Sequence, residues 1–318
     1  MADHHRRHAA RRRALADRLP AVPAPVRAVV HARRHQMTTV VSWNIQAGLG
    51  VDGRVDLDRI ARVIAALADA DVICLQEVEC PGGPAAGADQ FAAIADLFSR
   101  HAAIEGPCVQ RAAGREEYRF GNMVLSRLPV LSVFRHHLPW PAAPGVKHMP
   151  RQATEVTVET TAGALRVVTT HLEYHSAAHR RAQVARLREL HAEAAAQEQN
   201  PAEAHADGPY AGPVRPATSV TCGDFNMSVE SHEYAAMLES FDDGAPGLID
   251  AWSGLYPGRP HDPTCGVFDR VQWPAGPHCR DFFFVTENLL PRLVSLSVDL
   301  ETDASDHQPL ALTLDDTG

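Results

Sequence analysis

Two stretches of the chain hold pairs of apolar strands separated by only a few turn residues, and this spacing most restricts the possible fold. The first is 122–135, where Pro129 divides two apolar segments, and the second is 154–171, where Ala162 and Gly163 do so. Parallel neighbours need a crossover of about a dozen residues or more, so these connections are too short for crossovers. The spacing therefore argues against a purely parallel, doubly wound sheet.

The rest of the chain alternates apolar strands with amphipathic helices. Predicted strands occupy 38–44, 71–77, 219–224, 282–285, 293–298 and 309–314, and predicted helices occupy 57–70, 89–100, 176–197 and 231–240. Asp56 and Ser176 stand where an N-cap side chain would accept a backbone N–H at the start of a helix. Hairpins mixed with crossover helices predict an α/β fold in which two mixed β-sheets pack face to face between α-helices.

Composition and charge narrow the class of protein. With 318 residues, 45% of them hydrophobic, the chain can bury a large core, and no apolar run reaches the roughly 18 residues of a membrane span. The net charge of −9 and the pI near 6.0 make it a poor electrostatic match for a polyanion, although a local basic cleft could still bind one. The six cysteines show no paired metal spacing and no secretory signal accompanies them, so we expect a reducing, cytoplasmic location.

Residues 1–36 differ in composition from the remainder. They are rich in Arg, His and Ala, prolines interrupt their middle, and they lack the apolar region of a secretory signal. A basic arm for nucleic acid or anionic lipid, or a mitochondrial-type presequence, would also fit this composition. We expect a basic, disordered N-terminal extension over 1–36 and a folded domain over 37–318.

Polar side chains cluster at the ends of the predicted strands. Asn44, Glu77, His171, Asp224 and Asn226 follow strands, and Asp281, Asp306 and His307 precede them. Each one alone is more often a turn residue or a structural histidine. In antiparallel neighbours, however, the start of one strand lies beside the end of the next, so all of them can meet at one rim. Four carboxylates gathered there would repel one another without a cation, and hard oxygen donors suit Mg²⁺ or Mn²⁺ better than Zn²⁺.

The motifs around these residues occur in a recognisable order. They read SWNIQ, LQEVE, GNMVLSRLPV, THLEYHS, GDFNM, RDFFFV and SDHQPL. This ordered set resembles the endonuclease/exonuclease/phosphatase family of metal-dependent phosphohydrolases, over nearly the whole of 37–318. The resemblance implies a four-layer sandwich of two mixed β-sheets between helical layers, and a catalytic domain that hydrolyses phosphoester bonds.

The resemblance also implies a metal site. Glu77 would ligate a divalent metal, Asn44 would support it, and Asp306 would be a further ligand. The implied cofactor is Mg²⁺, with Mn²⁺ as the alternative.

The remaining motif residues carry the catalytic roles that the resemblance implies. Asp224 would orient and deprotonate the attacking water, and Asn226 would hold a phosphate oxygen and help to place Asp224. Asp281 would pair with His307 and favour its protonated form, so that His307 stabilises the charge growing on the phosphoryl group. His171 would contact the phosphate.

The family resemblance fixes the bond type but not the substrate. Gln46 stands where the abasic-site nucleases of the family carry an acidic residue, and His171 stands where they tend to carry a tyrosine. These departures and the acidic net charge favour a phosphodiesterase or phosphatase acting on a small or lipid-like phosphoester. A metal-dependent endo- or exonuclease acting on DNA or RNA is the alternative. A third hypothesis, from a different functional class, is a catalytically inactive binding module. No obligate protein partner is evident.

Candidate specificity residues lie in the loops. Segment 137–152 lies beside the site in family members, so Lys147, His148 and Arg151 are candidates for binding a phosphate or an acidic head group. Arg151 could instead cap the hairpin that follows. Two weaker readings are a stacking wall of Trp140, Trp252 and Trp273 and a zinc site of His261, Cys265, His278 and Cys279; packing is the commoner role for each tryptophan, and the zinc spacing fits no common pattern.

Overall fold

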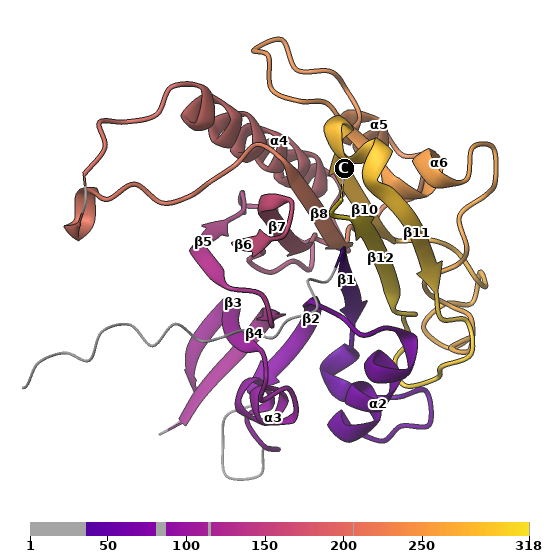
Figure 1. Cartoon of the computed structure of the whole chain (residues 1–318). Helices are drawn as coiled ribbons and strands as arrows, with labels where there is room; N and C mark the ends of the chain where they lie inside the picture. Colours follow the sequence, from indigo (N-terminus) through magenta and orange to yellow (C-terminus); the bar gives the residue numbers. More distant parts are fainter. Residues whose placement is uncertain (1–35, 81–86, 114–115, 206, 318) are drawn as a thin grey trace, which may run out of the picture. The chain divides into compact units, whose positions relative to one another are not determined.

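The chain folds into two mixed β-sheets (Figure 1). The computed structural model describes residues 36–80, 87–113, 116–205 and 207–317, so the extension expected over 1–36 lies, except for its last residue, outside the described residues. The first sheet has the strand order β11-β12-β1-β2-β4-β3, formed by β1 (Met37–Asn44), β2 (Val72–Cys80), β3 (Ala102–Ala113), β4 (Glu116–Ser126), β11 (Leu293–Val298) and β12 (Leu310–Asp315). The second has the order β5-β6-β7-β8-β10-β9, formed by β5 (Val130–His137), β6 (Gln152–Thr160), β7 (Gly163–His171), β8 (Ser219–Asp224), β9 (Leu248–Asp250) and β10 (Asp281–Thr286).

Helices cover the outer face of each sheet. They are α2 (Leu57–Leu67), α3 (Gln90–Leu97), α4 (Ala177–Gln199), α5 (His232–Met237) and α6 (Ala251–Leu255), with short 3₁₀ helices η1 (Gln46–Gly48), η2 (Gly208–Tyr210) and η3 (Glu287–Arg292). Ile60 and Ile64 of α2 pack with residues of β1 and β2, whereas Val184 and Leu187 of α4 pack with residues of β7 and β10. The predicted four-layer α/β sandwich is therefore confirmed.

The hydrophobic core between the two sheets is built by alternation along the strands. Val40 and Cys74 of the first sheet share one buried cluster with Val156, Val167 and Cys222 of the second. Because residues i and i+2 of a strand lie on the same face, each inner strand sends one set of side chains into this core and the other set toward the helices. The position of one sheet against the other is thus set by closely packed apolar side chains.

The structure departs from the sequence expectation in the region before Pro129. Strand β3 was not predicted, because Gly106 and Pro107 interrupt its apolar pattern. The two strands predicted within 122–135 do not pair with each other; β4 belongs to the first sheet and β5 to the second. The turn at Pro129 therefore carries the chain from one sheet to the other.

The local signals for turns and helix starts are borne out. Strands β6 and β7 form the predicted antiparallel hairpin, with Gly163 at φ +114° in its turn. The Asp56 side chain accepts the backbone N–H of Arg59, and the Ser176 side chain accepts that of His179, so both residues are N-caps. The predicted helix 57–70 ends earlier, at Leu67, because the backbone of Ala68 is extended.

A buried ion cluster ties the second sheet to the segment before β8. Glu155 on β6 accepts hydrogen bonds from Arg215 Nε at 2.6 Å and Nη2 at 3.0 Å, and its Oε2 lies 3.5 Å from Arg166 Nη1 and 3.2 Å from His136 Nε2. Burial alone would raise the pKa of Glu155, but the hydrogen bonds from His136 and Arg215 and the charge of Arg166 outweigh it and lower the pKa to about 2.

Glu155→Gln is expected to lower the free energy of unfolding by about 3 kcal/mol at pH 7, because it leaves two buried guanidinium groups without a counter-charge. The pKa of Glu155 lies below its ordinary value of 4.5, so its stabilising charge is fully present above that value and is lost as the pH falls toward 2. Urea unfolding between pH 7 and pH 3 should show the gap between wild type and variant narrowing below about pH 4.5. Glu159→Gln, an exposed site on the same strand, is the matched control; equal effects of the two substitutions would refute the role of the cluster.

Candidate active site

Three polar residues form a row across the second sheet. Strands β7 and β8 are parallel with His171 beside Asp224, and β8 and β10 are antiparallel with Asp281 beside Asp224. The register therefore brings the end of two strands and the start of a third together, as the sequence predicted. All three side chains are at least nine-tenths buried.

The first sheet supplies the facing residues. Asn44 ends β1, and Asp306 and His307 lie just before β12. Glu77 was predicted to end its strand, but it lies inside β2. The register between β2 and β4 shifts there, between Leu75 and Val78. Its backbone has φ +58°, in the left-handed region that non-glycine residues adopt only at a cost of about 1–3 kcal/mol. This bulge gives the carboxylate of Glu77 a direction that regular strand geometry would not allow.

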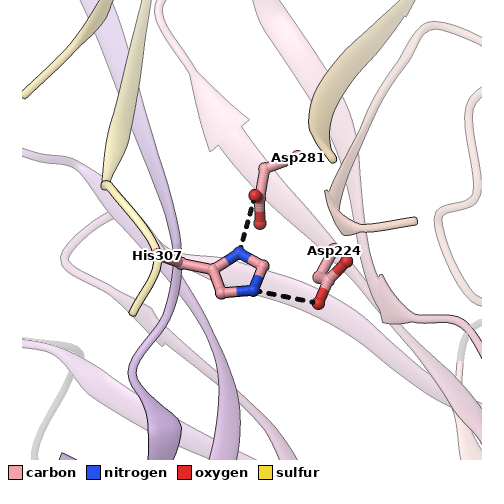
Figure 2. A group of neighbouring side chains, drawn as sticks. All are labelled: Asp224, Asp281 and His307. Carbon is pink, nitrogen blue, oxygen red and sulfur yellow. Dashed lines mark hydrogen bonds and ion pairs between the residues drawn. The ribbon is translucent and has the colours of Figure 1, made fainter. Parts of the chain in front are cut away.

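Asp281, His307 and Asp224 form a short chain of charged groups (Figure 2). His307 Nδ1 lies 2.8 Å from Asp281 Oδ2, and its Nε2 lies 3.7 Å from Asp224 Oδ2. Burial alone would lower the pKa of His307, but the carboxylates of Asp281, Asp224 and Asp306 outweigh it and raise the pKa well above its ordinary value. His307 is thus a buried cation between two carboxylates. Thr264 Oγ1 donates to the same Asp281 oxygen at 2.6 Å.

Asp224 is held from several sides. Its Oδ1 accepts the backbone N–H of Asn226 at 2.8 Å, and its Oδ2 accepts Asn44 Nδ2 at 3.1 Å. The bond to Asn226 is a turn contact, so GDFN is both a turn and part of the site. Burial raises the pKa of Asp224, and the positive charge of His307 opposes this rise. The negative charge of Asp281 raises the pKa further, so that it reaches about 7. A carboxylate with this pKa can take up a proton near neutral pH.

Glu77 and Asp306 provide hard oxygen atoms for a cation. Asn44 Nδ2 donates to Glu77 Oε1 at 2.9 Å, while its Oδ1 accepts the backbone N–H of Gln46, so Asn44 orients Glu77 through its amide nitrogen. Burial raises the pKa of Glu77, the hydrogen bond from Asn44 opposes it, and the negative charge of Asp306 raises it further. A divalent cation would relieve this repulsion, and the oxygen donors fit Mg²⁺ or Mn²⁺. Asp306 is itself held by Trp273 Nε1 at 3.0 Å.

These residues open onto one cleft with a volume of about 480 Å³. Its lining includes Glu77, His171, Asp224, Asn226, Asp306 and His307, together with all three candidate binding residues Lys147, His148 and Arg151. Asn44 and Asp281 lie behind this lining as hydrogen-bond partners. The predicted site residues therefore meet around one cavity.

His171 is a neutral imidazole in this cleft. Burial lowers its pKa well below the ordinary value, and the positive charges of Arg151 and His307 lower it further. Its Nε2 lies 3.4 Å from Asp224 Oδ2. Because the lowered pKa keeps the ring neutral, this contact is not an ion pair. Its buried Nδ1 makes no hydrogen bond within the described residues.

The weaker sequence readings are resolved by the structure. Trp252 is buried in the core between the sheets, whereas Trp273 lines the cleft. The zinc reading is wrong for the described residues: His261 Nε2 is bonded to Asp250 at 2.6 Å, away from the close pair of Cys265 Sγ and His278 Nε2 at 3.3 Å. The sequence analysis did not identify the positioning contacts of Thr264 and Trp273, because nothing in a single sequence shows which polar groups they reach.

Comparisons with known proteins agree with this architecture. The model of the Endonuclease/Exonuclease/phosphatase family matches residues 41–307. A search of curated proteins finds no match. Among solved structures, the chain is similar to an endonuclease/exonuclease/phosphatase from Beutenbergia cavernae DSM 12333, with 25% identity, 88% of this chain and 71% of that chain covered, and a TM-score of 0.62. The fold is shared by D. rerio TDP2 complexed with a single-strand DNA product, with 19% identity, 87% of this chain and 98% of that chain covered, and a TM-score of 0.56. It is also shared by the human Nocturnin catalytic domain with a bound sulfate anion, with 20% identity, 88% of this chain and 94% of that chain covered, and a TM-score of 0.56.

The chain belongs to the endonuclease/exonuclease/phosphatase family. It is a phosphoric ester hydrolase, and enzymes of this family generally depend on a divalent metal. Within the described residues, no helix combines the length and apolar character needed to cross a membrane. The cytoplasmic location stays a prediction.

Proposed function

We propose that this chain is a Mg²⁺-dependent phosphodiesterase or phosphatase that acts on a small or lipid-like phosphoester. The observation that carries the proposal is the pairing of Asp224, whose pKa is raised to about 7, with the buried His307 cation in one cleft. A proton acceptor beside a fixed positive charge is what hydrolysis of a phosphoester requires.

Glu77 and Asp306 would hold the metal, and Asn44 would orient Glu77. The compact group of Asp224, Asp281 and His307, whose candidate ligand atoms lie within 4.8 Å of one another, is a less suitable metal site, because a protonated His307 donates hydrogen bonds and offers no lone pair. When bound, Mg²⁺ neutralises charge on the phosphoryl oxygens and on the leaving oxygen.

The chain's own residues divide the proton and charge work. Asp224 Oδ2 would take a proton from water as the water oxygen bonds to phosphorus and the bond to the leaving oxygen breaks. His307, held by Asp281, would stabilise the negative charge that grows on the phosphoryl oxygens. Asn226 would keep Asp224 in place and hold a phosphate oxygen, and His171 would contact the phosphate as a neutral ring.

Arg151 supports a phosphate substrate in particular. It is 5% exposed and lines the cleft, and its buried Nε and Nη1 make no hydrogen bond within the described residues. Its nearest ionic contact is Glu173 Oε2, at 3.5 Å from Nε. Buried guanidinium nitrogens without hydrogen bonds are costly unless a ligand accepts from them, and a phosphate matches the planar donors of arginine.

A nuclease remains the second candidate. D. rerio TDP2, which shares this fold, forms a complex with a single-strand DNA product. The uncharged Gln46 in the cleft and the net charge of −9 favour the smaller substrate.

A substrate screen with and without metal tests the proposal. We expect Mg²⁺-dependent hydrolysis of a bis-aryl phosphate or a mono-aryl phosphate, abolished by EDTA and restored by added Mg²⁺, in parallel with assays on sphingomyelin and plasmid DNA. Rapid plasmid cleavage without activity on the small esters would instead support the nuclease.

The metal site is tested by Glu77→Ala, which should weaken Mn²⁺ binding measured by calorimetry at least about tenfold. Unaltered binding would refute the role of Glu77 as a ligand.

A further inference from the structure

The segment between β5 and β6 carries two cations into the cleft. Leu138 N donates to Arg151 O at 2.9 Å, which closes the segment 138–151 into a loop. The loop is fixed from within the fold by Met149 N, which donates to Glu173 Oε2 at 3.1 Å, and by Pro141 O, which lies 2.7 Å from the ring nitrogen Nε2 of His179 on α4.

The residue directly after Lys147 is held as well. His148 Nδ1 accepts Trp140 Nε1 at 2.6 Å, and the His148 ring stacks on that of His179 with centroids 4.7 Å apart. The backbone on the C-terminal side of Lys147 is therefore anchored to α4, which restricts the region that the lysine side chain can reach.

Lys147 itself is free. It is the only lysine in a chain with 30 lysine and arginine residues, it is exposed, and it lines the cleft. Its ammonium makes no hydrogen bond or ion pair within the described part of the chain. An anchored loop thus presents an unpaired ammonium to the same cavity that holds the buried guanidinium of Arg151.

We propose that the substrate carries a second phosphate, which Lys147 binds in the outer part of the cleft while Arg151 binds the phosphate that is hydrolysed. This inference rests on the proposed function and adds the substrate class. Three residues lie between Lys147 and Arg151, so four steps along the chain separate their Cα atoms, which lie at most about 14 Å apart. The cleft volume of about 480 Å³ is in the range that holds whole small-molecule ligands rather than a single phosphate.

Labelling of Lys147 tests the binding step without relying on turnover. An N-hydroxysuccinimide acetate can acylate only the Lys147 amine and the α-amino group, so the α-amino group is an internal reference in peptide mass spectrometry. Thymidine 3′,5′-bisphosphate is expected to protect Lys147 at a concentration about tenfold lower than thymidine 5′-phosphate does. Equal protection by the two ligands, or none, would overturn the inference.

Turnover of a matched substrate pair separates this inference from the proposed function. The p-nitrophenyl ester of thymidine 5′-phosphate, with and without a 3′-phosphate, should show kcat/KM about tenfold higher for the form with the second phosphate. Lys147→Gln should remove that preference by lowering kcat/KM more for the ester with two phosphates than for the ester with one, and Lys147→Arg should retain it. Arg62→Gln, exposed and outside the cleft lining, is the control and should leave kcat/KM for both esters unchanged. Hydrolysis of both esters at equal rates refutes the second phosphate alone, whereas failure to hydrolyse either, with Lys147 still protected, refutes the proposed activity on small phosphodiesters.

Discussion

Asp224→Asn is expected to lower kcat by about 10³-fold on the best substrate, because the amide cannot accept the proton of the attacking water. Asparagine has nearly the same shape, and it can still accept the backbone N–H of Asn226, so the fold should be retained. Steady-state kinetics at saturating Mg²⁺, together with circular dichroism and thermal unfolding, would measure both expectations.

The matched control is Asp242→Asn, which removes a carboxylate from an exposed position outside the cleft lining. It should leave kcat unchanged. If Asp224→Asn hydrolysed the substrate at the wild-type rate, Asp224 would not be the general base. Absence of hydrolysis in the wild type on every phosphoester tried would instead favour the inactive binding module.

Gly223→Ala is expected to destabilise the fold by about 4 kcal/mol or more. Gly223 precedes Asp224 with φ +136°, and a Cβ built there would lie 1.9 Å from the carbonyl oxygen of Thr170 on the neighbouring strand. That oxygen belongs to the backbone of β7, in parallel register with Gly223, so it cannot move aside as a flexible side chain would. Chemical denaturation would measure the loss, and reduced soluble yield would accompany it.

Gly163→Ala separates backbone strain from the clash. Gly163 also has a positive φ, of +114°, but a Cβ there would meet nothing within 4 Å. Its substitution should therefore cost only about 1–2 kcal/mol, the strain of a left-handed backbone. Similar losses at the two glycines would show that close strand approach at Gly223 contributes nothing.

Much of the fold could be predicted because its signals are local. Strands rich in β-branched residues, N-caps such as Asp56 and the hairpin at Gly163 each depend on a few neighbouring residues. Strand β3 could not be predicted, because Gly106 and Pro107 mask its pattern and its pairing with β4 depends on contacts outside the segment. Nor could the sequence predict that the chain crosses from the first sheet to the second at Pro129, because a short turn between two strands fits a hairpin equally well.

The site divides in a similar way. Strand ends are visible in a sequence, so His171, Asp224 and Asp281 could be expected to meet, and the register confirms that they do. The bulge that turns Glu77 toward the cleft is not visible, because it arises from mismatched pairing between β2 and β4. Nor could the sequence show that Nε and Nη1 of Arg151 are buried without a hydrogen bond, since burial depends on the whole surrounding fold.

The candidate site residues come from both sheets: Glu77 from β2 and Asp306 and His307 from the turn before β12 belong to the first, and His171, Asp224 and Asp281 belong to the second. Their mutual spacing is therefore governed by the apolar layer in which Val156 and Cys222 pack against the opposite sheet. Changing the volume of a residue in that layer would shift the site residues of one sheet relative to those of the other. Laboratory evolution for altered rate should consequently recover substitutions deep in this interior, at positions that no substrate ever touches.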